Sequence, residues 1–87
     1  MYKIKISKDV ARLLKKCPQY ISQKFREKTT YMKRDVFDPR CDIVKLINTD
    51  NDWRLRVWDY RFFFTIIDHD ITIYFFDAGA RWDVYKK

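Results

Sequence analysis

At 87 residues the chain has room for one domain, and its 47% hydrophobic and 18% aromatic residues are enough for one compact core. This composition excludes an intrinsically disordered chain, although 36% of the residues are charged. The net charge of +7 is uneven, because residues 1–36 carry eleven Lys and Arg against three acids, whereas residues 37–87 carry eight against nine. The N-terminal excess of positive charge favours encounter with a polyanion, or else serves only solubility.

An exported, membrane-embedded or metal-binding protein is not expected either. Met1 leads directly into an alternating run, and no apolar stretch approaches the ~18 residues that span a bilayer. We therefore expect a cytoplasmic protein. Cys17, Cys41 and His69 do not have the usual spacing of metal ligands, so we expect two free thiols in a reducing compartment and no cofactor.

The first third of the chain predicts a strand followed by two helices. Residues 2–6 alternate polar and apolar, which is the period of a half-buried strand. Ser7 is a typical N-cap for a first, short helix, and Pro18 ends that helix. Apolar residues at helical spacing from Ile21 to Val36 predict a second, longer helix.

The rest of the chain predicts strands. After a turn signal at residues 38–40, four runs are rich in β-branched and aromatic residues, at 43–47, 53–57, 60–67 and 71–78. Short polar connections between them imply an antiparallel meander, with the single glycine, Gly79, just after the last strand. The expected fold class is α+β, in the order β-α-α-β-β-β with a short C-terminal element. In this single domain over residues 1–87, two N-terminal helices pack on one face of an antiparallel sheet.

Three arginines are expected on one face of this sheet. Side chains alternate along a strand, so Arg54 and Arg56 point away from the apolar residues between them. If residues 58–59 form a two-residue turn, Arg56 lies opposite Arg61 and Arg54 opposite Phe63. Like charges directly across a ladder are destabilising, and arginine donates two hydrogen bonds to phosphate. The pattern therefore favours a bound anion.

Pairing with nearby acids is the alternative. A three-residue loop at 68–70 would set Arg61 opposite Asp77 as a surface ion pair. That pairing accounts for one arginine and leaves Arg54 and Arg56 without assigned partners.

Two more residues are expected at the same end of the sheet. Arg81 and Tyr85 come just after the last strand, which runs back toward Arg61. His69 lies in the opposite turn, ~26 Å from Arg61 along a strand at about 3.3 Å per residue. A catalytic histidine working with these arginines is therefore not expected.

Several short segments within residues 35–87 carry a family resemblance through their order and spacing. They are Asp38-Pro39-Arg40, Lys45-Leu46, Trp53-Arg54-Leu55-Arg56-Val57, Asp59-Tyr60-Arg61 and Gly79-Ala80-Arg81-Trp82-Asp83-Val84-Tyr85. Together they resemble the RelE/ParE toxin superfamily of type II toxin–antitoxin systems. Resemblance to the RelE branch implies an endoribonuclease that enters the ribosomal A site and cuts mRNA there. It also implies a cognate antitoxin protein that holds the toxin inactive.

The resemblance also implies which residues carry the chemistry. They are Arg54, Arg56, Arg61, Arg81 and Tyr85. Arginines stand at 54 and 56 where the best-known members have lysines, and arginine, with a pKa above about 12, is a poor proton acceptor. Tyr85 is the first candidate for the general base or for orienting the 2′-hydroxyl, and the general acid stays open.

Three functions remain open at this point. The first is a metal-independent, ribosome-dependent endoribonuclease that inhibits translation. The ParE branch shares the scaffold but inhibits DNA gyrase by binding it and has no nuclease activity. A basic RNA-binding module without catalysis is the third.

Overall fold

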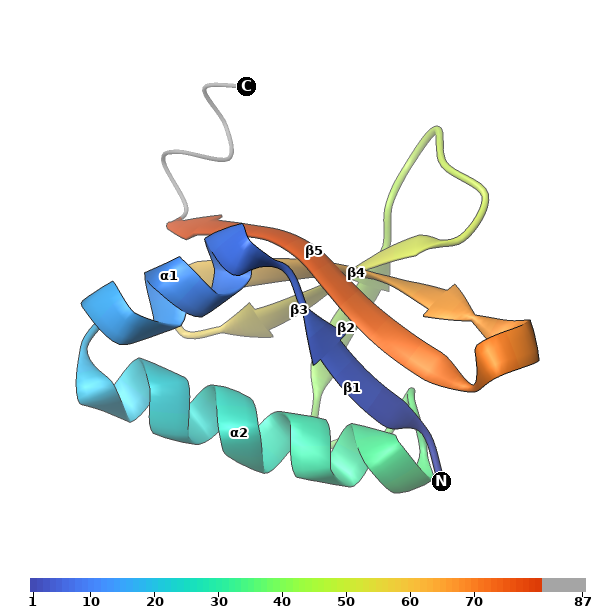
Figure 1. Ribbon diagram of the computed structural model, residues 1–87, viewed down its shortest axis with the longest axis horizontal. Coiled ribbons are helices and arrows are strands. Elements are labelled where there is room, and N and C mark those ends of the chain that lie inside the picture. Colours follow the sequence, from blue (N-terminus) through green and yellow to red (C-terminus); the bar gives the residue numbers. More distant parts are fainter. Residues whose placement is uncertain (81–87) are drawn as a thin grey trace.

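Eight elements make up the computed structural model, which describes residues 1–80 of the 87 (Figure 1). In chain order they are β1 (Lys3–Ile6), α1 (Lys8–Lys16), α2 (Gln19–Arg34), β2 (Asp42–Lys45), β3 (Asp52–Val57), β4 (Tyr60–Ile67), the 3-10 helix η1 (Asp68–Asp70) and β5 (Thr72–Ala80). The α+β class is confirmed. Four strands follow the helices, one more than the expected order. The predicted sites Arg81 and Tyr85 lie outside the described residues.

The five strands form one sheet in the order β1-β5-β4-β3-β2. Strands β2 to β5 are the expected antiparallel meander. Strand β1 pairs parallel to β5, with Lys3 opposite Thr72 and Ile6 opposite Phe75, so the sheet is mixed rather than wholly antiparallel. This pairing joins residues about 70 positions apart, and no local pattern in the sequence encodes it.

The helix boundaries follow from local chemistry. Ser7 Oγ accepts a hydrogen bond from the Val10 amide at 3.2 Å, which satisfies one of the free amides at the start of α1. Cys17 ends α1, and Pro18 stands just before α2, where its missing amide costs no hydrogen bond. Helix α2 ends at Arg34, two residues before the expected end.

Both helices cover the same face of the sheet, as expected (Figure 1). Val10 from α1 and Ile21 from α2 are fully buried in one cluster with sheet residues. The Phe25 ring of α2 lies 4.4 Å from the Phe62 ring and 5.0 Å from the Phe75 ring, centroid to centroid. Burial of each such ring stabilises the fold by roughly 2–3 kcal/mol. This core fixes the register of β4 and β5, and neither helix covers the other face of the sheet, which we call the open face.

The two cysteines are free thiols, as the sequence predicts. Burial raises the pKa of both Cys17 and Cys41. Within residues 1–80, no helix is both long and apolar enough to cross a membrane.

Candidate functional site: an arginine cluster on the open face of the sheet

The predicted arginine face is present. Val57 pairs with Tyr60, so residues 58–59 form a two-residue connection, Arg56 lies opposite Arg61 and Arg54 opposite Phe63. Leu55 and Val57 are buried on the helical side, and the alternation of strand residues turns the arginines to the other side. Arg54, Arg56 and Arg61 therefore share the open face, and we call them the arginine cluster.

The three members of the cluster differ in exposure. Arg56 is exposed, Arg54 is half-buried, and Arg61 is 5% exposed. The Nε of Arg56 donates to the Trp58 carbonyl at 2.9 Å, which holds this side chain along the turn. The Nε of Arg54 is buried, and none of residues 1–80 accepts a hydrogen bond from it. A buried donor of this kind is costly unless an acceptor binds there.

Acids stand at the margins of the cluster. Asp42 on β2 lies opposite Arg56, and Asp77 on β5 lies opposite Phe63. The expected register, with Arg61 directly opposite Asp77, is wrong. Ile71, at φ 48°, lengthens the loop to residues 68–71, and a β-bulge at Phe63/Phe64 shifts the register again.

Gly79 takes the place opposite Arg61 instead. The sequence had suggested that Gly79 follows the last strand, but it lies within β5. Glycine puts no side chain directly opposite Arg61 in the ladder, and glycine inside a strand often marks a bulge or the close approach of a ligand or another backbone. The bulge produces this arrangement, because it reverses the alternation of β5: Phe75 faces the core, whereas Asp77 and Gly79 face the open side.

One end of the molecule holds the cluster. The β3–β4 turn, the end of β5 and the start of α2 gather at the left of Figure 1, and η1 lies at the opposite end. His69 is in η1, so its expected separation from Arg61 is confirmed. Strand β5 ends at Ala80, opposite Tyr60, so the described chain stops beside the cluster. Among the described residues no group of three or more His, Cys, Asp or Glu could hold a metal ion.

An exposed aromatic pair at this end was missed by the sequence analysis. Trp58 is 62% exposed and Tyr20 57%, and their rings meet edge to face with centroids 6.2 Å apart. The sequence did contain a sign of this pair, because a tryptophan occupies a two-residue turn in which glycine or asparagine is preferred.

An ion pair anchors the loop between α2 and β2. Arg40 donates from Nε and Nη2 to the two carboxylate oxygens of Asp38, at 3.0 and 2.8 Å, and its guanidinium carbon lies 3.7 Å from the centre of the Tyr31 ring. The hydrogen bonds from Arg40 lower the pKa of Asp38 to about 2. Lys28 of α2 donates to the Arg40 carbonyl at 2.6 Å. Because these contacts join loop to helix, we assign the group a structural role.

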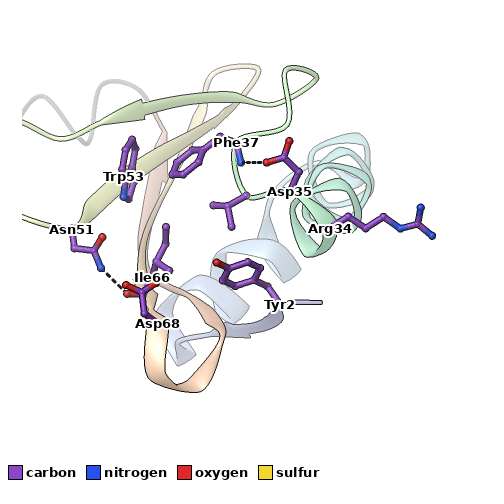
Figure 2. Close-up of a pocket in the computed structure, with 9 residues that line it drawn as sticks. Tyr2, Arg34, Asp35, Phe37, Asn51, Trp53, Ile66 and Asp68 are labelled. Atoms are coloured by element: carbon purple, nitrogen blue, oxygen red, sulfur yellow. Dashed lines mark hydrogen bonds between the residues drawn. The ribbon is translucent and has the colours of Figure 1, made fainter.

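A pocket of about 390 Å³ lies at the other end, between the chain after α2 and the starts of β1 and β3. Figure 2 shows Phe37 beside Trp53, with rings 4.5 Å apart, and the Arg34 side chain pointing away from the pocket. The Asn51 amide donates to the Ile66 carbonyl at 2.6 Å. None of the clustered arginines lines this pocket, so it is separate from the candidate site.

Solved structures of RelE toxins are similar to the chain over nearly its whole length. RelE from an archaeal RelE–RelB complex of Pyrococcus horikoshii OT3 is 25% identical, with a TM-score of 0.79 over 92% of this chain and 94% of that one. RelE–RelB from Methanococcus jannaschii gives 23% identity and a TM-score of 0.78, over 93% of this chain and 94% of that one. The isolated E. coli RelE toxin is 14% identical, with a TM-score of 0.77 over 99% of this chain and 93% of that one.

The chain therefore has a RelE-like fold, and the matches support a toxin of that kind. No protein-family model matches the sequence, and comparison with curated proteins gave no significant match.

Proposed function

We propose that this chain is the toxin of a type II toxin–antitoxin pair, a metal-independent endoribonuclease that cleaves mRNA in the ribosomal A site and so inhibits translation in the cytoplasm. Similarity to RelE toxins and to RelE–RelB complexes supports the toxin and its antitoxin partner. The observation that carries the nuclease proposal is the register that sets Arg54, Arg56 and Arg61 on one open face.

The arginine cluster suits the charge that develops during RNA cleavage. Attack of the 2′-hydroxyl on phosphorus adds negative charge to the phosphate oxygens, and preorganised cations stabilise that charge. Arg61 acts from a buried position, where a charge interacts more strongly than it does in water. Arg56 meets the phosphate from solvent, and the buried Nε of Arg54 offers a donor without a described acceptor.

The proton transfers need a different group. An arginine is a poor acceptor, so the cluster supplies no general base. Tyr85 is the residue that we assign to deprotonate or orient the 2′-hydroxyl, and Arg81 is assigned to the same phosphate as Arg61. Arg61 is also assigned to stabilise or protonate the leaving 5′-oxygen. Because this acid–base equipment is weak, the ribosome supplies the in-line positioning of the substrate.

Ribosome dependence gives the direct test. A defined message is translated by purified ribosomes with the protein, new 5′ ends are mapped, and a second tube holds the same mRNA without ribosomes. We expect new ends inside the message only with ribosomes. Equal cutting in both tubes would contradict ribosome dependence. No cutting in either tube, together with inhibition of DNA gyrase, would favour a ParE-like function.

The antitoxin proposal is tested separately. An acidic, amphipathic segment would cover the basic end or the helical face, where positive charge and the short edge strands β1 and β2 are available. Co-expression with the adjacent reading frame should restore growth and yield a soluble complex. Unchanged toxicity with that frame expressed would argue against it as the partner.

A further inference from the structure

The Trp58–Tyr20 pair is an exposed aromatic surface next to the arginine cluster. Trp58 is in the turn that follows Arg56 by two residues, or about 7 Å of extended chain. In an edge-to-face pair with Tyr20, at least one face of the indole is left uncovered by its partner, which agrees with an exposed fraction of 62%. The ring therefore contacts α2 through Tyr20, which leaves at least one of its faces uncovered.

The backbone of Trp58 is in an unfavourable conformation. Its φ is 56°, in the left-handed region where glycine and asparagine are favoured and bulky side chains are disfavoured. Burial does not explain a tryptophan here, because the side chain is mostly exposed. An exposed ring kept at a strained position points to a role in binding.

The neighbours of Trp58 indicate which ligand the ring would take. Arg56 donates from Nε to the Trp58 carbonyl at 2.9 Å, so one guanidinium is tied to the same turn as the ring. Arg61 lies across the ladder from Arg56. Proteins that bind single-stranded nucleic acid combine cations along the backbone with aromatic rings on which bases stack. Asp42, Asp59 and Asp77 also lie at this end, so the three described arginines are not in excess over acids there.

We infer that Trp58 is the stacking platform for one base of single-stranded RNA, one or two nucleotides from a phosphate held by Arg56 and Arg61. The inference rests on the proposed function for its choice of RNA as the ligand. Trp58 is a positioning residue in this role, since it touches a base and not the reacting phosphate. Every base offers a π-face, so this contact adds affinity and fixes the register of the strand with little sequence preference.

Trp58→Asn separates binding from folding. Asparagine tolerates a positive φ, so the variant keeps the turn and removes only the ring. The probe is a short single-stranded RNA with 2′-O-methyl riboses, which cannot be cleaved through the 2′-oxygen, measured by fluorescence anisotropy at low salt. We expect Trp58→Asn to weaken binding about 5- to 100-fold, the range for loss of one stacked base. The thermal midpoint should stay the same or rise.

Matched variants complete the design. Trp58→Phe keeps an aromatic face and should retain most of the affinity. Ile47→Asn removes an apolar side chain that is 86% exposed in the β2–β3 connection, away from the cluster, and should bind as the parent does. Arg56→Ala should weaken binding and flatten its salt dependence.

An abasic scan identifies the stacked nucleotide. One base at a time is removed from the probe, and each probe is measured with the parent and with Trp58→Asn. We expect one abasic position to weaken binding to the parent as much as Trp58→Asn does, and to have no further effect on that variant, because the two changes remove the same contact.

Several results would overturn the inference. One is that Trp58→Asn binds the probe as tightly as the parent does. Another is that the effects of Trp58→Asn and of base removal on affinity add at every abasic position. The third is that the parent shows no measurable binding of the probe. Loss of antitoxin binding with RNA binding intact would instead make the pair a protein-docking surface. The test does not depend on cleavage: a protein that binds RNA through Trp58 but cuts nothing on ribosomes would contradict the proposed function and leave this inference standing.

Discussion

Arg61 on β4 and Gly79 on β5 face each other across the ladder, so a buried guanidinium has no β5 side chain directly opposite it. The φ of Gly79 is not positive, so the backbone there does not require glycine. The glycine is better explained by the space that it leaves on the open face. In the proposed function, a phosphate bound by Arg61 would occupy that space.

Gly79→Val should fill this space. Valine suits a strand, so the fold should persist, but its branched side chain would displace a phosphate from Arg61. We expect single-turnover cleavage on ribosomes to fall about tenfold to a hundredfold, since displacement by about 1 Å has effects of that size. Gly79→Ala should give a smaller loss. Thr65→Val, on the same face nearer the η1 end, is the control, and an undiminished rate for Gly79→Val would show that the space is not used.

The exposed and buried arginines should differ in what they contribute. Arg61→Ala removes a cation from the transition-state phosphate and should slow single-turnover cleavage about 10²- to 10³-fold at saturating ribosomes. Arg56→Ala should mainly weaken binding of the substrate. Most of its effect on the cleavage rate should therefore disappear at saturating ribosomes. Lys15→Ala and Lys16→Ala, on α1, should flatten the salt dependence of binding and spare the chemical step. Equal rate losses for Arg61→Ala and Lys15→Ala would contradict a specific role for Arg61.

Tyr85→Phe tests the assignment of the base. The substitution keeps the ring and deletes the phenolic group, so cleavage should fall by about two to four orders of magnitude if that group transfers a proton. Ribosome binding, followed by co-sedimentation, should barely change. Cleavage at the parent rate would make the tyrosine structural, and another base would have to be sought.

The Asp38–Arg40 pair predicts a pH dependence of stability. The pKa of Asp38 is lowered to about 2 in the folded state, so its ionised form stabilises the fold above the usual carboxylate pKa, and this contribution is lost as the pH falls toward about 2. Asp38→Asn should therefore have a lower thermal midpoint than the parent at pH 7, and the difference should narrow between about pH 4 and pH 2.

Asp9→Asn is the control for that measurement. Asp9 pairs with Arg12 at 3.2 Å on the exposed side of α1, where an ion pair contributes little. Its thermal midpoint should match that of the parent across the same pH range. A constant gap between Asp38→Asn and the parent down to pH 2 would contradict the titration of Asp38.

Local patterns were enough to predict most of the fold and the register of the arginine cluster. The N-cap at Ser7, the break at Pro18 and the two-residue turn after Val57 are each decided by neighbouring residues, and the turn alone fixes Arg56 opposite Arg61. Positions set by distant pairing could not be predicted in this way. The four-residue loop at 68–71 and the bulge at Phe63/Phe64 each shift the register by one residue, and together they set Gly79 rather than Asp77 opposite Arg61.

The exposed aromatic pair was missed for a related reason. Tyr20 and Trp58 are 38 positions apart in the chain, and their contact requires α2 to begin beside the β3–β4 turn. Residue type alone would have assigned both rings to the core. The sequence marks Trp58 as an unusual turn residue, but its contact with Tyr20 is visible only in the folded structure.

The parallel pairing of β1 with β5 has a consequence for the order of synthesis. Residues 3–6 leave the ribosome early but have no strand to join until residues 72–75 have emerged. Arg61 likewise meets Gly79 only when the last strand is available. A nascent chain therefore has neither a complete sheet nor a complete arginine face until β5 has emerged from the ribosome.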